Sequence, residues 1–101
     1  MDERQFSRYF KAIGDPSRLR ILGLLAGKEI TVNELVKILG TSQSTVSRHL
    51  SVLRSAGFVR DRREGQRVFY SLNKTAVSDC CAGLCIRLEI PAPPGPRKKR
   101  K

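Results

Sequence analysis

The chain has 101 residues, and its 20 Lys and Arg against nine Asp and Glu give a formal net charge of +11. A chain of this length holds one domain with room for a tail, which argues against a large multi-substrate enzyme. The positive charge favours a polyanionic partner. Nucleic acid is preferred to a membrane because no apolar run approaches the roughly 20 residues of a spanning helix. The first residues are not typical of a secretory signal, so we expect a cytoplasmic protein.

Two helices are predicted in the first quarter of the chain. The apolar stripe of the first comprises Phe6, Tyr9, Phe10 and Ile13, which recur at helical spacing. Gly14 ends this helix. Asp15 followed by Pro16 is a typical helix start, a capping carboxylate and then a proline at the first helical position. The second helix ends at Gly27.

The next two predicted helices are short and close together. The third opens at Thr31 or Val32 and ends at Gly40, and the fourth is capped by Thr41 or Ser42. The fourth helix buries Val46, Leu50 and Leu53 and ends at Gly57. Two helices joined by so short a turn form a helix-turn-helix pattern.

After residue 57 the apolar period changes from 3.6 to 2. Residues 58–63 and 66–72 read as strands, with Glu64-Gly65 as a two-residue turn between them. The hairpin carries a basic tip of Arg60, Arg62, Arg63 and Arg67. The predicted fold class is therefore α+β and mainly helical, a winged helix-turn-helix with a two-stranded β-hairpin as its wing.

The fourth helix has side chains suited to the major groove of DNA. Residues 42–49 read Ser-Gln-Ser-Thr-Val-Ser-Arg-His, short or hydrogen-bonding and without an acid. Gln and Arg make bidentate contacts with base edges, and the arginines of the wing suit phosphates or the minor groove. The alternative is that the Ser and Thr residues only cap the helix and the arginines are a solvated surface. His49 either packs partly or binds a phosphate, and we do not expect it to bind a metal.

Three segments resemble the ArsR/SmtB family of winged-helix repressors. Residues 15–22 (Asp-Pro-Ser-Arg-Leu-Arg-Ile-Leu) are similar to its opening motif, residues 42–50 and 53–57 to its recognition helix, and residues 63–72 to its wing. The resemblance covers about residues 6–73. It implies a homodimer that binds an inverted-repeat operator in double-stranded DNA and is released by an inducer, often a metal or metalloid. It also implies that the first and last helices build the dimer.

The resemblance assigns DNA contacts residue by residue. In the recognition helix these are Gln43, Ser44, Thr45, Ser47, Arg48 and His49. From the wing we add Arg62, Arg63 and Arg67.

The inducer site is expected at three cysteines near the end of the chain. Thr31 and Asn33 stand where arsenic-sensing relatives carry a Cys-x-Cys before the recognition helix, and the only histidine lies in the recognition helix itself. The remaining candidates are Cys80, Cys81 and Cys85. Three thiols suit a soft three-coordinate ion, so As(III) or Sb(III) is the expected inducer, without an organic cofactor.

Geometry restricts how these thiols can meet. On a helix Cys81 and Cys85 share a face, whereas Cys80 is about 100° away from Cys81. All three converge only if the backbone is irregular, which the neighbouring Gly83 favours, or if the partner subunit supplies thiolates. The alternatives are packing in a dimer interface and redox sensing through a disulfide or persulfide.

The expected domain spans residues 1–90 and is followed by a disordered, Pro-rich basic tail over 91–101, which adds contacts with phosphates or only solubility. The chain shows no paired carboxylates, no Gly-rich phosphate loop and no activated nucleophile, so we do not expect an enzyme. A winged-helix interaction module without a ligand remains a different class of function.

Overall fold

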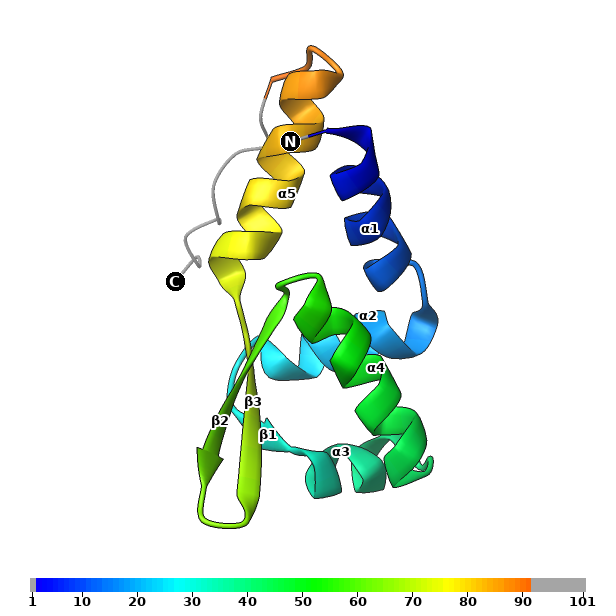
Figure 1. Cartoon of the computed structure of the whole chain (residues 1–101), viewed down its shortest axis with the longest axis vertical. Coiled ribbons are helices and arrows are strands. Elements are labelled where there is room, and N and C mark those ends of the chain that lie inside the picture. The colour runs from blue at the N-terminus through cyan, green and yellow to red at the C-terminus, as the bar shows by residue number, and fades with distance from the viewer. Residues whose placement is uncertain (1, 92–101) are drawn as a thin grey trace, which may run out of the picture.

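Five helices and three strands form in residues 2–91, the part of the chain that the computed structural model describes. In chain order they are α1 (Glu3–Ile13), α2 (Pro16–Leu25), β1 (Ile30–Thr31), α3 (Val32–Leu39), α4 (Gln43–Ser55), β2 (Val59–Glu64), β3 (Arg67–Leu72) and α5 (Lys74–Arg87) (Figure 1). The expected tail lies, apart from Pro91, outside the described residues. Within the described residues no helix is both long and apolar enough to span a membrane.

Side-chain caps determine where the helices begin. The carboxylate of Asp15 accepts a hydrogen bond of 3.1 Å from the backbone N–H of Arg18, and Pro16 occupies the first turn, as the sequence predicts. Of the two candidates for the cap of α4, Ser42 is the one that accepts from the N–H of Thr45. Thr31 caps α3 and exchanges hydrogen bonds with Glu34 in a capping box.

The turn between α3 and α4 depends on one glycine. Gly40 has a φ of +66° and donates its N–H to the carbonyl of Val36 at 2.9 Å, which closes α3 in a left-handed cap. The chain then re-enters a helix within three residues. This turn packs α3 against α4 and confirms the predicted helix-turn-helix.

The sheet has one strand more than the sequence predicts. Its order is β1-β3-β2, with antiparallel pairing throughout. Ile30 and Thr31 pair with Tyr70 and Phe69, so the wing hairpin of β2 and β3 is held at its inner edge by a two-residue strand. So short a strand has too few residues to show a period-2 pattern in the sequence.

The turn of the wing is also displaced by one residue from its predicted position. Glu64 pairs with Arg67, so the two turn residues are Gly65 and Gln66 and the prediction of Glu64-Gly65 was wrong. Gly65 has a φ of +63° at the first turn position. Both primed hairpin turns require positive φ at this position, which glycine adopts without strain.

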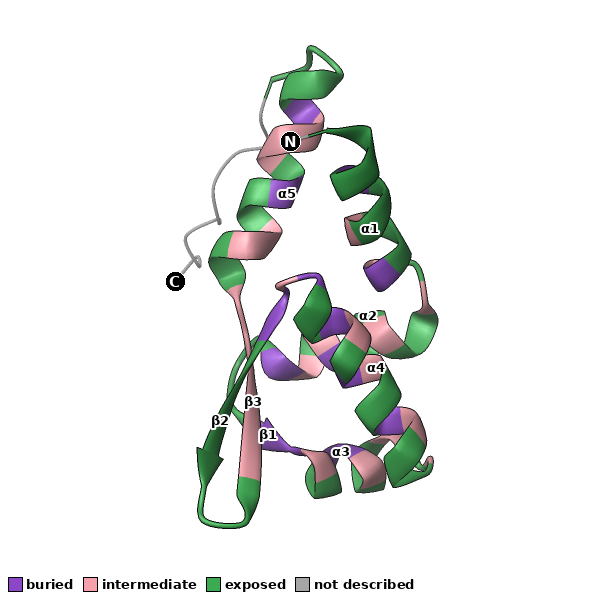
Figure 2. Cartoon of the chain, viewed as in Figure 1, coloured by how far each residue is buried: buried purple, intermediate pink, exposed green. Residues whose placement is uncertain are grey.

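One apolar core joins the helix-turn-helix to the sheet. Its largest fully buried side chains are Phe58, Ile21, Ile30, Leu35, Leu50, Leu53 and Val46. Figure 2 shows buried positions on α2, α3, α4 and β1 in the lower half of the view, whereas α1 is largely exposed and α5 carries exposed, half-buried and buried positions. The prediction that Val46, Leu50 and Leu53 form the buried face of α4 is confirmed. Because this face packs into the core, the opposite face of α4 points toward solvent.

Candidate nucleic-acid interface

The exposed face of α4 carries four of the six side chains predicted to contact DNA from the recognition helix. Gln43, Ser44, Ser47 and Arg48 are exposed, because they lie opposite the buried stripe. No acidic residue occurs in α4. The face is therefore small, hydrogen-bonding and basic, which suits the major groove.

Thr45 and His49 differ from these four in being half-buried. The Ser42 hydroxyl donates to Thr45 Oγ1 at 2.9 Å, so Thr45 takes part in the cap of α4. His49 Nδ1 lies 3.2 Å from Nη1 of Arg18, which belongs to α2. Both side chains line a concavity together with Ser17 and Arg20, so they lie at the edge of the recognition helix next to α2. No signal in the sequence singled out Arg18 beyond its place in the family motif.

The arginines of the wing differ in how far their charge is already paired. Arg62 donates to both carboxylate oxygens of Glu29, at 2.8 and 3.1 Å, and to Glu64 at 3.3 Å. This pairing lowers the pKa of Glu29 and raises that of Arg62 further above its ordinary value. Arg63, in contrast, is exposed and forms no ion pair with any residue between 2 and 91.

Arg62 and Arg67 are also held by an aromatic ring. Their guanidinium carbons lie 4.7 and 5.0 Å from the centroid of Phe69, close enough for cation–π attraction. Arg67 has no carboxylate partner among residues 2–91, so its charge is available at the surface. Of the three predicted wing contacts, Arg63 and Arg67 present unpaired charge and Arg62 does not.

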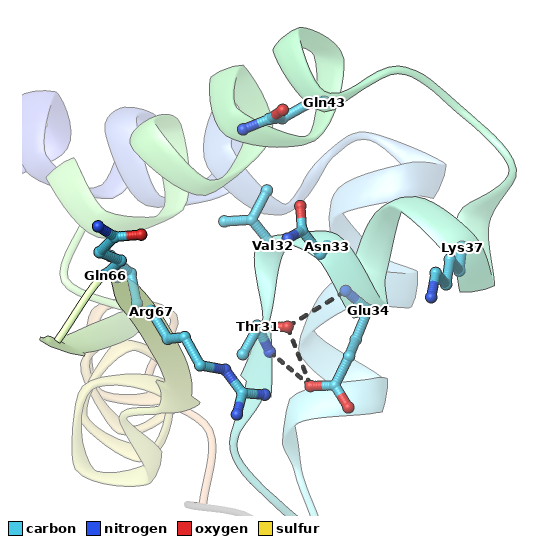
Figure 3. A pocket seen from close by; sticks show the side chains of 9 residues that line it. Thr31, Val32, Asn33, Glu34, Lys37, Gln43, Gln66 and Arg67 are labelled. Carbon is cyan, nitrogen blue, oxygen red and sulfur yellow. Dashed lines mark hydrogen bonds between the residues drawn. The ribbon is translucent and has the colours of Figure 1, made fainter. Parts of the chain in front are cut away.

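A concavity of about 340 Å³ lies between the recognition helix and the wing. Figure 3 shows Gln43 on α4, Asn33 and Lys37 on α3, and Gln66 and Arg67 on the hairpin surrounding it. Glu34 is the one acidic side chain of the lining. Its carboxylate is occupied by the N–H and hydroxyl of Thr31 in the capping box, and these hydrogen bonds lower its pKa.

This concavity adds residues that the sequence analysis missed. Asn33, Lys37 and Gln66 supply hydrogen-bond donors between two surfaces already predicted to contact DNA. The sequence does show Lys37 as a basic residue on the polar side of the first helix of the helix-turn-helix. Its position across the concavity from the wing depends on the tertiary fold.

The three cysteines lie on a regular helix. The α5 helix continues through Gly83 without a break, with Cys80 and Cys85 buried and Cys81 exposed. Burial raises the pKa of the Cys80 thiol, and the adjacent Cys81 adds to this effect. The local irregularity that would bring all three thiols together does not occur. Within residues 2–91 of one chain, no three His, Cys, Asp or Glu side chains are grouped to hold a metal ion.

Comparisons with known proteins show which protein family has this sequence and architecture. A family model described as "Bacterial regulatory protein, arsR family" matches residues 15–61. The chain is 41% identical over 70 residues to the transcriptional repressor SdpR of Bacillus subtilis (strain 168), which covers 69% of this chain and 78% of SdpR. It is 48% identical over 65 residues to the arsenic resistance transcriptional regulator ArsR2 of Pseudomonas putida, covering 63% of this chain and 56% of that protein.

A solved structure extends the similarity to the whole fold. The homodimeric winged helix-turn-helix DNA-binding domain Mb0332 from Mycobacterium bovis matches with a TM-score of 0.70 at 32% identity. The match covers 85% of this chain and 81% of that one. Motifs, winged helix-turn-helix architecture and relatives agree, and the chain belongs to the ArsR/SmtB family of bacterial regulatory proteins.

Proposed function

We propose that the protein is a cytoplasmic transcriptional repressor that binds an inverted-repeat operator as a homodimer and is released by As(III) or Sb(III). The observation that carries the DNA-binding part is the exposed, acid-free face of α4 beside the donor-lined concavity and the wing. Gln43, Ser44, Ser47 and Arg48 then contact base edges. Arg63 and Arg67 contact the backbone or the minor groove, and Lys37 adds a positive charge on the α3 side of the concavity.

A second copy of the chain is the proposed cover for the exposed apolar side chains of α1, of α5 and of the residues directly after α5. Phe10, Ile86, Leu88 and Ile90 have exposed fractions between 38% and 77%. The two helices contact each other at the end of the molecule far from the tip of the wing and from the N-terminal turn of α4 (Figure 1). Pairing through them leaves both recognition helices on the DNA side, where half-sites are about 34 Å apart.

The chemistry of the inducer follows from the three thiols. Arsenite, As(OH)3, exchanges each hydroxide for a thiolate, and each thiol proton leaves in a water molecule. The thiolate is the reacting form, so the buried Cys80, whose pKa is raised, reacts more slowly than the exposed Cys81. Because α5 is regular and exposes only Cys81, the proposed site needs a local change in α5 or thiolates from both subunits. The relative ArsR2, described as an arsenic resistance regulator, supports arsenic as the first ion to test.

Release then follows from the position of the cysteines. A change in α5 moves it against α1, and this alters the spacing of the two recognition helices. A coupling of about 1–3 kcal/mol between inducer and operator lowers the affinity for DNA by roughly 5–150-fold.

The decisive experiment measures fluorescence anisotropy of the reduced protein on a labelled duplex from upstream of its own gene. Sequence-specific binding that is weakened in Gln43→Ala and Arg48→Ala supports the repressor, and equal binding to any duplex points to a different function. As(III) is then titrated into the complex. Release from the wild type but not from Cys80→Ser, Cys81→Ser or Cys85→Ser supports the cysteine site, and release from all three variants refutes it.

A thiol-redox repressor is the second candidate, and the exposure of Cys81 favours it. An accessible thiol beside a second cysteine can form a disulfide or a persulfide. In the same assay this candidate predicts release by an oxidant or a persulfide donor and no release by As(III) under reducing conditions.

A further inference from the structure

Arg18 links three elements at one point of the molecule. Its Nε donates to the carbonyl of Ala12 at 2.6 Å and its Nη2 to the carbonyl of Lys11 at 3.1 Å. These carbonyls belong to the last turn of α1, whose acceptors have no partner within the helix. The remaining arm of the guanidinium, Nη1, lies 3.2 Å from Nδ1 of His49 on α4.

The chemistry of arginine determines which tautomer of His49 is present. A guanidinium has donors and no acceptor, so in this contact Nδ1 must be the acceptor and carries no proton. The proton of the neutral ring is therefore on Nε2. Through this contact Arg18 selects the form of His49 in which Nε2–H is a donor.

The surroundings of His49 indicate what this donor can bind. The ring lines a concavity of about 230 Å³ together with Ser17, Arg20, Thr41 and Thr45. These side chains offer hydroxyl donors and one cation, and no carboxylate lines the concavity. Such a set suits a phosphodiester oxygen.

One acidic group acts on the histidine from the side. Asp15 is near enough to His49 for the two to interact electrostatically. Its carboxylate already accepts the N–H of Arg18 as the cap of α2, and this hydrogen bond lowers its pKa. Asp15 is thus engaged in the helix cap.

We propose that Arg18 is a positioning residue for operator binding. It holds His49 in the Nε2–H tautomer, so that this donor meets a backbone phosphate beside the recognition helix, and it ties that contact to the end of α1. The inference rests on the proposed binding of DNA. It adds Arg18 as a positioning residue and names Nε2 of His49 as the atom that donates to the phosphate.

The tautomer can be measured directly, because the chain has a single histidine. A long-range ¹H–¹⁵N spectrum of the DNA-free protein distinguishes a protonated from an unprotonated ring nitrogen. We expect Nδ1 to be unprotonated in the wild type, and the two nitrogen shifts to move toward each other in Arg18→Gln as the second tautomer becomes populated. A wild-type ring with its proton on Nδ1, or a spectrum unchanged by Arg18→Gln, overturns the proposal.

Two substitutions of the histidine test its use in binding. The amide nitrogen of glutamine reaches about the position of Nε2, and the side chain of asparagine reaches only about that of Nδ1. We expect His49→Asn to bind the operator about tenfold more weakly than the wild type, the effect of removing one phosphate hydrogen bond per subunit, and His49→Gln to retain more of the affinity. Equal losses in both variants overturn the proposal.

Arg18→Gln is compared with Lys74→Gln, which removes the same charge at the start of α5. Arg18→Gln should weaken operator binding severalfold more than Lys74→Gln, and equal effects contradict the positioning role. Failure of the wild type to prefer its operator would refute the proposed function, whereas the tautomer experiment can still be read. The two failures are therefore distinguishable.

Discussion

Arg62 and Glu29 form a bidentate ion pair across 33 residues of sequence, with N–O distances of 2.8 and 3.1 Å. The pair joins strand β2 of the wing to the segment just before β1. In this geometry two N–H groups of the planar guanidinium donate to the two carboxylate oxygens, and the negative charge of Glu29 balances the positive charge of Arg62. Arg62 therefore holds the wing in place, and this leaves Arg63 and Arg67 as the unpaired charges of the wing.

The first prediction separates these roles. Arg63→Gln should lower operator affinity and reduce the slope of log K against log salt by about 0.9 for each phosphate that the protein no longer neutralises. Arg62→Gln should change that slope less, because its charge is already balanced by Glu29. Affinities measured from low to moderate salt test both variants. Equal slopes in the two variants would show that the ion pair does not persist in the complex.

The second prediction concerns acid. The hydrogen bonds from Arg62 hold the pKa of Glu29 below its ordinary value of 4.5. A carboxylate with a depressed pKa in the folded state stabilises that state above the pKa of the unfolded chain and loses this effect as the pH falls through the folded value. Wing signals in NMR spectra should therefore shift and broaden as the pH falls below about 4.5. The Glu29→Gln protein should lack this transition, and a transition of equal size in that variant would assign it to another group.

The third prediction compares two exposed glycines. Gly40 has a φ of +66° and Gly23 is a helical residue of α2, and an added Cβ meets nothing within 4 Å at either position. Gly40→Ala should destabilise the protein by about 1 kcal/mol, because alanine is strained in the left-handed region. Gly23→Ala should stabilise it by about 0.5–1 kcal/mol through helix propensity. Urea unfolding at one fixed protein concentration measures both, and the same sign for both would contradict the assigned conformation of Gly40.

The fourth prediction concerns the three thiols. Cys81 is exposed, whereas Cys80 and Cys85 are buried and burial raises the pKa of Cys80. Native, reduced protein should therefore show one fast thiol and two slow ones toward a thiol reagent at pH 8, since the thiolate is the reacting form. Cys81→Ser should lose the fast phase, and all three thiols should react quickly in denaturant. A fast phase that survives in Cys81→Ser would assign the accessible thiol to another position.

Local chemistry made much of the fold predictable from the sequence. A capping side chain, a proline in the first turn and a glycine in the left-handed region act within a few residues. Asp15-Pro16, the pair Thr41 and Ser42, and Gly40 therefore predict helix ends to within a residue or so, and the structure selects Ser42 as the cap. The spacing of apolar residues in α4 and in the wing is also a property of neighbouring residues, so it can be recognised from the sequence. From this spacing the sequence also predicted which face of α4 is buried and which carries Gln43 and Arg48.

Contacts between distant segments could be decided only by the tertiary structure. The strand β1 exists because Ile30 and Thr31 find partners in β3, and the turn of the wing sits at Gly65 and Gln66 because the cross-strand register ends at Glu64 and Arg67. In the sequence nothing distinguishes Arg62 from the other arginines of the wing. Its ion pair with Glu29 forms because the fold brings the two residues together. His49 likewise obtains its tautomer from Arg18, a residue 31 positions earlier in the chain. The sequence determined the elements through short-range sterics and hydrogen bonds, whereas the partner of each charged side chain depended on where packing placed it.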